Sequence, residues 1–405
     1  MTEIWFVRHG ETTANAAGVW QGQGDVGLSA RGREQAGVVG ERLRGTPFDL
    51  VVASDQVRAR DTAADAGFAA EPDPAWREMD IGCWDGLTLA EVTARYGDDL
   101  RALAAGQDLA VGGGETWSGF RARVQAARAG LERRLGPEER ALVVTHGAVI
   151  HALLSGVLHL SARRPSVLEH GPNTALTVLA GSDGAWRVRT LNDAGHLGLA
   201  PVPGERTAVV GLARHGESEA NAAGIWHGVT DGPLSPRGLL QGAELAARYD
   251  TVDYVYSSQL QRARLTAAAF GASRGLEPAV RPDLHEMGYG RWEGLTAEQI
   301  QETFPDDWAA NYVEGSDVPR GRTGETAAGT AARMRQAVEE IAAAHPGGRV
   351  LAFSHGGAIR ACVGGILGLG VAARDLLESP GNVSVTHLRV GAKGIVVADY
   401  NAGVV

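Results

Sequence analysis

The sequence predicts an α/β protein of two tandem domains, each with a mostly parallel central sheet. The first observation is a repeat: positions 8–32 match positions 214–238 without a gap, and 16 of these 25 residues are identical. The second is that short apolar runs typical of strands alternate with helical patterns in each half. Repeats of about 200 residues are whole domains, not solenoid units. A stretch rich in proline and glycine, 195–208, predicts domains 1–202 and 203–405.

Each half is predicted to follow the same order of elements. In the first half we expect a strand at 3–7, a helix at 28–43 capped by Ser29, a strand at 48–54, a helix at 56–67, and a strand at 140–147 that runs into an apolar helix. In the second half, strands are expected at 208–213, 252–258 and 349–356, and Ser235 is the corresponding helix cap.

The composition excludes several classes of function. A net charge of −10 argues against nucleic acid or an anionic membrane as the main partner. Lys393 is the one lysine, so the chain has no P-loop and Schiff-base chemistry is not expected. Cys83 and Cys362 lie in different halves and match neither a zinc spacing nor a disulfide framework. With no signal peptide or membrane span expected, we predict a cytoplasmic protein.

The candidate reactive groups follow the predicted strands. In open α/β sheets, ligands bind outside the carboxyl ends of the strands, and His9 and His146 both come directly after such strands. A neutral imidazole can attack phosphorus and form a phosphohistidine. Positioned arginines and a second imidazole would stabilise the negative charge on the transferred group. Arg8 and Arg58 are the candidate clamps, with His146 as the second imidazole.

A carboxyl group is needed to protonate the leaving alcohol and then to take a proton from water. Glu78 is the candidate, because Glu286 holds the same place when 77–86 is aligned with 285–294. Without the repeat, a solvated loop carboxylate would be the better interpretation of Glu78.

These motifs resemble the histidine phosphatase superfamily, the phosphoglycerate-mutase-like or RHG family. Four separated motifs occur in the family's order, and they occur twice. The resemblance implies two three-layer α/β/α sandwich domains with no required metal or cofactor. It implies the following site residues: His9 and His215 as phosphorylated nucleophiles; Arg8, Arg58 and His146 in the first phosphate pocket; Arg214, Arg262 and His355 in the second; Asn15 and Asn221 touching the phosphate; Glu78 and Glu286 as acid and base.

The predicted function is hydrolysis of a small phosphorylated metabolite by both domains. A mutase is the first alternative, but the family's mutases carry a longer insertion before the acid, and here Arg58 and Glu78 are only 20 positions apart. One active domain joined to a regulatory copy that binds phosphorylated ligands is the second alternative. Both halves keep every candidate residue, which disfavours it. The oligomeric state is left open.

Other features receive structural interpretations. Trp84 and Trp292 are expected to pack in the core, and 112–116 and 323–326 are expected to be glycine turns that lead into helices. His151 and Arg360 occupy equivalent positions, and a solvated helix face is preferred for both over contact with a second anionic group.

The halves differ in the stretch after the acid, where substrate choice is expected to reside. The first stretch, 87–113, is small and aliphatic. The second stretch adds aromatic and cationic residues: Phe304, Trp308, Tyr312, Arg320 and Arg322. We therefore expect the second site to accept a more aromatic or more anionic leaving group, with neutral drift in a helical cover as the competing interpretation.

Overall fold

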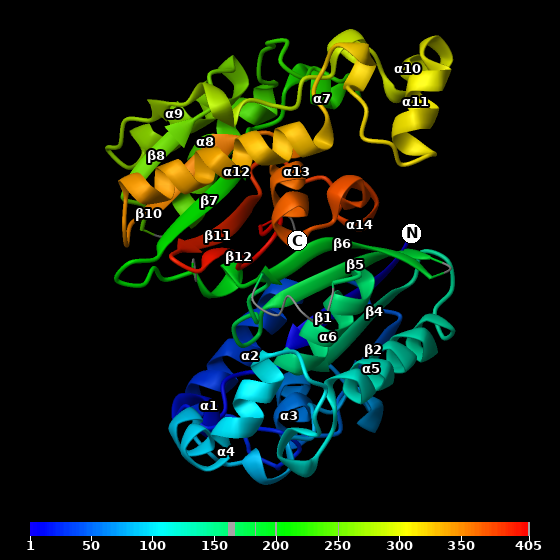
Figure 1. The fold of residues 1–405 in the computed structure, drawn as a ribbon, viewed down its shortest axis with the longest axis vertical. Coiled ribbons are helices and arrows are strands. Elements are labelled where there is room, and N and C mark those ends of the chain that lie inside the picture. The colour runs from blue at the N-terminus through cyan, green and yellow to red at the C-terminus, as the bar shows by residue number, and fades with distance from the viewer. Residues whose placement is uncertain (161–166, 183, 199–200, 250, 404–405) are drawn as a thin grey trace. The chain divides into compact units, whose positions relative to one another are not determined.

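The computed structural model describes residues 1–160, 167–182, 184–198, 201–249 and 251–403. The chain divides into two compact units, each with a sheet of its own (Figure 1). The first unit comprises Met1–Ser166 and His170–Leu197, and the second comprises Val167–Glu169 and Gly198–Val405. A three-residue segment from the first half of the sequence therefore belongs to the second unit.

The first unit is built on a six-stranded sheet of order β3-β2-β4-β1-β5-β6. Its strands are β1 (Thr2–Arg8), β2 (Leu50–Ala53), β3 (Glu71–Pro72), β4 (Arg140–Thr145), β5 (Leu176–Ser182) and β6 (Ala185–Asp193). The pairs among β1 to β4 are parallel, whereas β5 is antiparallel to both β1 and β6. The predicted mostly parallel sheet is confirmed, and the antiparallel β5–β6 edge is an addition that the sequence did not indicate.

Helices flank this sheet in two packed pairs, α2 with α3 and α5 with α6. The helices are α1 (Thr13–Ala16), α2 (Ala30–Leu43), α3 (Val57–Asp65), α4 (Leu89–Ala104), α5 (Trp117–Glu132) and α6 (Gly147–Val157). The chain moves from β1 outward to β3 through α2 and α3, and then returns through α5 and α6. Because crossovers are right-handed, opposite directions of travel put the two pairs on opposite faces. The central strands β1 and β4 are accordingly buried almost throughout, as covered parallel strands are.

The second unit repeats this architecture. Its sheet has the order β12-β11-β7-β10-β8-β9, and β11 is antiparallel to β7 and β12. The strands are β7 (Ala208–Arg214), β8 (Tyr254–Ser257), β9 (Ala279–Val280), β10 (Arg349–Ser354), β11 (Val385–Gly391) and β12 (Gly394–Val397). The helices are α7 (Glu219–Ala222), α8 (Pro236–Arg248), α9 (Gln261–Ala272), α10 (Ala297–Thr303), α11 (Pro305–Tyr312), α12 (Ala327–Ala344), α13 (Gly356–Leu367) and α14 (Ala373–Leu376).

Local sequence explains where these helices begin. The Ser29 and Ser235 hydroxyls accept hydrogen bonds from Gly32 N and Gly238 N at 3.0 Å, as predicted for helix caps. The stretch after the acid is helical in both units and breaks at the equivalent residue. α4 is kinked at Tyr96, whereas in the second unit Pro305 follows the break at Phe304 and starts α11 as a helix separate from α10.

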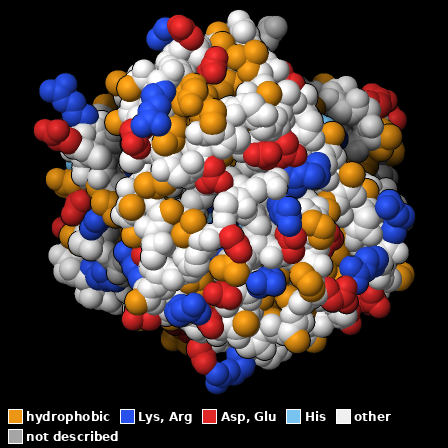
Figure 2. Space-filling view, turned by 90° about the horizontal axis from the view of Figure 1, so that it is seen from below, with side chains coloured by type: hydrophobic (Ala, Val, Ile, Leu, Met, Phe, Trp, Pro, Cys, Tyr) orange, Lys and Arg blue, Asp and Glu red, His pale blue; other side chains and the backbone are white. Residues whose placement is uncertain are grey.

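The surface carries both signs of charge. On the face drawn in Figure 2, Lys and Arg side chains are interspersed with Asp and Glu, and no single-sign field gathers there. Among the helices of the described residues, none is both long enough and apolar enough to cross a membrane.

Candidate active site

A pair of histidines lies at the carboxyl edge of each sheet. β1 and β4 are neighbouring parallel strands in register at Arg8 and Thr145, so His9 and His146 follow them side by side. Their ring centroids are 5.2 Å apart. In the second unit, β7 and β10 bring the rings of His215 and His355 to 5.0 Å. The structure therefore brings together the imidazoles that the sequence placed at strand ends.

His9 is held in one tautomer. Its Nδ1 lies 2.7 Å from Gly10 O, and because a carbonyl can only accept, Nδ1 carries the proton and Nε2 keeps its lone pair. Burial, followed by the charges of Arg8 and Arg58, lowers the pKa of His9 well below its usual range. His215 repeats this arrangement with Gly216 O at 2.6 Å and a similarly lowered pKa. Both rings therefore present an unprotonated nitrogen at neutral pH.

The arginine of helix α3 is fixed by the loop that precedes α2. Arg58 is fully buried, and its two terminal nitrogens donate to Gly22 O at 2.7 Å and Gly24 O at 2.9 Å. Its Nε donates to His146 Nδ1 at 3.2 Å. Arg262 makes the corresponding terminal contacts with Gly228 O and Thr230 O. The helix thus places a guanidinium group directly behind the second imidazole.

Each site contains buried nitrogens that lack a partner within the described residues. In the first unit these are Arg8 Nε and His146 Nε2, and in the second they are Arg214 Nε and His355 Nδ1. Buried polar groups in folded proteins are nearly always hydrogen-bonded, so each exception calls for an explanation. Two unpaired nitrogens beside a neutral histidine and a buried arginine are explained by an anionic ligand that accepts from them.

The second imidazole is supported differently in the two units. His146 accepts from Arg58, whereas His355 Nε2 lies 2.9 Å from the hydroxyl of Ser258. Burial lowers the pKa of both rings well below their usual range. Ser258 was not identified from the sequence, although it lies four residues before Arg262 in the arginine motif.

An asparagine after the last helix of each unit was missed by the sequence analysis. Asn173 Nδ2 donates to His9 O at 2.9 Å and to Asn15 Oδ1 at 3.3 Å, and Asn382 makes the same contacts with His215 and Asn221. These bonds link the predicted phosphate-contacting asparagine to the backbone of the predicted nucleophile. Extending the internal repeat to 171–175 and 380–384 would have found the pair.

The candidate acid lies at the N-terminus of the helix that follows the second histidine. The oxygens of Glu78 accept from Met79 N at 2.9 Å and from Ala148 N, in the first turn of α6, at 3.2 Å. Glu286 accepts from Met287 N, Gly357 N and Ala358 N in the second unit. Because a helix N-terminus favours a negative group, this position holds each carboxylate next to the paired imidazoles.

The glycine turn after α4 supports the backbone that carries Glu78. Glu115, which follows this turn, accepts from Asp80 N and pairs with Arg123 on α5, and Arg123 also donates to Glu78 O at 3.2 Å. Glu325 and Arg333 form the equivalent pair in the second unit. Both stretches are glycine turns leading into helices, as predicted, but their support of the acid loop was not foreseen.

Two further expectations have different outcomes. Trp84 and Trp292 are buried, 1% and 0% exposed, as predicted for packing residues. The solvated helix face expected for His151 and Arg360 is wrong. Both side chains are half-buried and line cavities, and the His151 ring stacks on His170 with centroids 4.6 Å apart. Position along a helix could not reveal this, because segments distant in sequence build the walls of these cavities.

Each site gathers groups that are suited to binding an anion. Across the described part of the chain, no three His, Cys, Asp or Glu side chains gather in a way that could hold a metal ion. Each unit brings together two neutral imidazoles, two guanidinium groups and one carboxylate. This set provides a nucleophile, cationic stabilisation and a proton carrier for phosphoryl transfer.

Comparisons with known proteins agree with this chemistry. A family model described as the histidine phosphatase superfamily (branch 1) matches residues 4–194 and again residues 210–403. Phosphoserine phosphatase 1 of Hydrogenobacter thermophilus is 32% identical over 160 residues, which cover 39% of this chain and 75% of that protein.

Other relatives carry different names. The probable phosphoglycerate mutase GpmB of Erwinia tasmaniensis is 34% identical over 213 residues, or 49% of this chain and 95% of that protein. Among solved structures, a mycobacterial glucosyl-3-phosphoglycerate phosphatase in complex with VO3 is 32% identical and covers 46% of this chain and 96% of its own, with a TM-score of 0.42. Each relative thus corresponds in length to about one half of this chain.

Proposed function

Because the chain belongs to the histidine phosphatase superfamily in both of its halves, we propose that each half hydrolyses small phosphomonoesters through a phosphohistidine. His9 and His215 are the nucleophiles of this proposal. Arg8, Arg58 and His146 bind the phosphoryl oxygens in the first half, and Arg214, Arg262 and His355 do so in the second. The protein acts on a phosphorylated metabolite in the cytoplasm.

In the first step, His9 Nε2 attacks phosphorus and the bond between phosphorus and the leaving oxygen breaks. The electron pair of that bond stays on the leaving oxygen, which takes a proton from the carboxyl group of Glu78. Negative charge on the transferred group is stabilised by Arg8, Arg58 and His146, which are positioned before the reaction.

In the second step, water attacks the phosphohistidine. Glu78, now ionised, takes a proton from the water, the N–P bond breaks, and inorganic phosphate leaves. The Gly10 carbonyl keeps the proton on His9 Nδ1 throughout, so the ring returns to its starting tautomer. Asn15 has its side-chain oxygen engaged by Thr12 N and Asn173, which leaves its amide NH₂ to contact the phosphate.

The observation that supports this function most strongly is the set of unpaired nitrogens. In each half, a nitrogen of the second imidazole and the Nε of the strand-end arginine are buried without a partner among the described residues, beside the neutral nucleophile. A tetrahedral oxyanion supplies the acceptors that these donors lack.

The test is capture of the covalent intermediate. Each protein is incubated with a radiolabelled phosphomonoester, and the reaction is quenched in alkali, in which phosphohistidine is stable. The bound label is then counted on the wild-type chain, His9→Ala, His215→Ala and the double variant. We expect up to two labels per wild-type chain, one on each single variant and none on the double variant. Label on the double variant, or hydrolysis by it, would contradict the proposal.

Transfer of phosphate between positions is the second candidate, because one relative is named a probable phosphoglycerate mutase. Conversion of 3-phosphoglycerate to 2-phosphoglycerate at a rate equal to phosphate release would replace the hydrolase assignment. We expect phosphate release to dominate, because Arg58 and Glu78 are only 20 positions apart, without the longer insertion that the family's mutases carry before the acid.

A further inference from the structure

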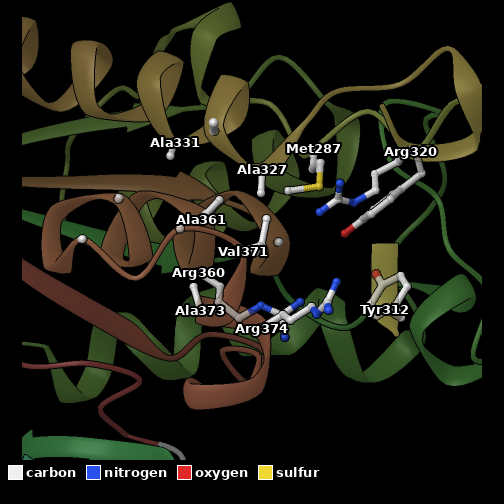
Figure 3. Close-up of a pocket in the computed structure, with 16 residues that line it drawn as sticks. Met287, Tyr312, Arg320, Ala327, Ala331, Arg360, Ala361, Val371, Ala373 and Arg374 are labelled. Carbon is white, nitrogen blue, oxygen red and sulfur yellow. The ribbon is translucent and has the colours of Figure 1, made fainter. Parts of the chain in front are cut away.

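A cavity in the second unit adjoins the candidate acid and is not used by the mechanism above. Its volume is about 380 Å³, and its walls include Met287, Tyr289, Tyr312, Arg320, Gly357, Arg360 and Arg374 (Figure 3). Gly357 also donates its N–H to Glu286 at 3.1 Å. Because Glu286 is the group that would protonate the leaving oxygen, the cavity lies where the leaving group would extend.

Two arginines of this cavity have nitrogens without partners. In the described part of the chain, Arg360 makes no hydrogen bond or ion pair, and Arg374 Nη1 is buried and unpaired. The Arg374 side chain is 11% exposed, and its one acidic contact within the described residues is an Nε bond of 3.3 Å to the exposed Asp375. Figure 3 shows the guanidinium groups of Arg360 and Arg374 extending together toward Tyr312. Unpaired guanidinium groups that meet in a cavity are typical of a site for an anion.

The remaining polar groups of the cavity complete this site. Arg320 is buried, donates to Val318 O at 2.8 Å and pairs with Asp317 at 3.4 Å, so its charge is partly balanced and Arg360 and Arg374 supply most of the positive charge of the cavity. Burial and the nearby Glu286 raise the pKa of Tyr289 well above its usual range, so its hydroxyl stays protonated and can donate. Arg374 lies over the ring of Tyr312 at 4.7 Å, a contact that holds the guanidinium in place. The cavity lining contains three arginines and no acid.

The first unit has a cavity in the same place with a different character. It measures about 600 Å³, and it contains Met79, Val111 and His151 at the positions of Met287, Arg320 and Arg360. Its charged members are one arginine, Arg121, and one acid, Asp108. Burial lowers the pKa of His151 to about 4, so this imidazole is neutral at pH 7. The first cavity therefore has no excess of positive charge.

We propose that the second domain selects phosphomonoesters whose leaving alcohol carries a further anionic group, a carboxylate or a second phosphate, and that Arg360 and Arg374 bind this group. The first domain accepts uncharged leaving groups. This specificity rests on the proposed function, since it assigns the part of the substrate that departs from the phosphohistidine.

The sequence analysis expected the two sites to differ in leaving group, and the structure assigns this difference partly to other residues. Of the five residues in the second stretch, Tyr312 and Arg320 line the cavity. Arg322 is exposed and bonded to Asp307, and Trp308 stacks on Tyr312 with centroids 4.3 Å apart. Phe304 precedes Pro305 at the junction of two helices. Arg360 and Arg374, whose charges distinguish the second cavity from the first, lie after His355 in the sequence.

The experiment uses the full chain with one site disabled. In the His9→Ala chain, kcat/KM is measured for glycerol 3-phosphate, 3-phosphoglycerate and glycerol 1,3-bisphosphate, which differ in the charge of the leaving group. We expect a preference of about tenfold or more for at least one of the two anionic leaving groups, because hydrogen bonds to charged groups contribute at this level. The two anionic esters distinguish a carboxylate from a phosphate. The His215→Ala chain should show no such preference.

Arg360→Gln in the His9→Ala chain should reduce this preference about tenfold. Arg322→Gln is the matched control, an arginine of the same unit that does not line the cavity, and it should leave the preference unchanged. Equal use of charged and uncharged esters by the His9→Ala chain, or a preference unaffected by Arg360→Gln, would overturn the proposal. The proposed function would still stand in that case, because the uncharged ester would be hydrolysed.

If no hydrolysis is detected, a binding measurement tests the assignment of Arg360 to the anionic leaving group. Calorimetry of 3-phosphoglycerate and glycerol 3-phosphate is performed on the His9→Ala/His215→Ala chain with and without Arg360→Gln. A selective weakening of 3-phosphoglycerate binding by Arg360→Gln would support the cavity assignment. Equal weakening of both esters, or none, would reject it.

Discussion

At the scale of single residues, burial sets the chemistry of each site. The paired imidazoles are shielded from water and lie beside arginines, and both effects favour the uncharged ring. A neutral His9 can attack phosphorus without first losing a proton to solvent. The same burial leaves nitrogens of Arg8 and His146 without a hydrogen-bond partner among the described residues. One cause therefore accounts for both the proposed nucleophile and its proposed phosphate pocket.

This burial predicts how stability depends on pH. The four site histidines have lowered pKa values in the folded chain, whereas in the unfolded chain they titrate near 6.5. Below that pH the unfolded state binds protons that the folded state does not, so the unfolding free energy falls as pH decreases. Each histidine can contribute about 1.4 kcal/mol per pH unit.

Urea unfolding at pH 7.5 and pH 5.5 measures this effect. We expect a lower unfolding free energy at pH 5.5, and a smaller difference in His146→Gln, which lacks one of the four groups. Equal stability at the two pH values would show that these rings are not held neutral.

A second residue-scale prediction concerns the hydroxyl that fixes the nucleophile loop. Thr62 Oγ1 accepts from Gly10 N at 2.9 Å and donates to Arg58 O at 2.6 Å. Thr62→Val keeps the shape of the side chain but leaves Gly10 N buried without a partner, which costs about 1–3 kcal/mol. We expect lower stability and a lower kcat in the His215→Ala chain, where the first site is measured alone.

Thr266→Val is the matched variant, because Thr266 makes the same bond to Gly216 N in the second unit. In the His215→Ala chain it should leave the first site's kcat unchanged. A fall in kcat with Thr266→Val as large as with Thr62→Val would mean that the effect is not local.

At the scale of elements, the loop that carries the acid depends on helix α5. Arg123 pairs with Glu115 through both carboxylate oxygens and donates to the carbonyls of Ala75, Arg77 and Glu78. The Arg123 side chain thus links helix α5 to the glycine turn and to the loop that carries Glu78. We expect it to act by positioning Glu78 and not by contacting substrate.

Arg123→Gln should therefore lower kcat of the first site several-fold with little change in KM, because the acid moves while the phosphate pocket stays. The measurement is steady-state kinetics in the His215→Ala chain. Arg128→Gln is the control, since Arg128 lies on the same helix but pairs with Glu132. A rise in KM at unchanged kcat would place Arg123 in substrate binding instead.

Much of this arrangement could be predicted from the sequence because it lies at the ends of strands. His9 and His146 were identified from apolar runs that end in a histidine and a glycine, and the repeat supported each choice. Asn173, Ser258 and Arg123 were not identified. Their roles depend on which loops the fold brings together, although the internal repeat holds an asparagine, a serine and an arginine at these places in both halves. The antiparallel β5 was also missed, because the direction of a strand depends on which neighbours the fold gives it.

At the scale of the whole molecule, the chain carries two complete sites on two separate sheets. Each unit supplies its own imidazole pair, arginines and carboxylate. Under the proposed function, substrate choice would depend on the cavity beside each acid, where His151 and Arg360 occupy equivalent positions with different charge. A single polypeptide would then apply one reaction to two kinds of ester.

The segment Val167–Glu169 has a consequence for this organisation. Leu168 pairs in parallel with Val397 of β12, the edge strand of the second sheet, and Glu169 binds Arg389 at 2.7 Å. A fragment that starts at the predicted boundary, 203–405, lacks this segment and exposes the hydrogen-bonding groups of an unprotected sheet edge. Such edges recruit other chains. Light scattering tests this in the full chain, where Glu169→Pro removes the N–H that donates to Val397 O at 2.9 Å. We expect more self-association than in the wild-type chain, and equal behaviour of the two would contradict this. Dividing the chain at residue 203 therefore separates the second unit from Val167–Glu169, the segment that covers the edge of its sheet.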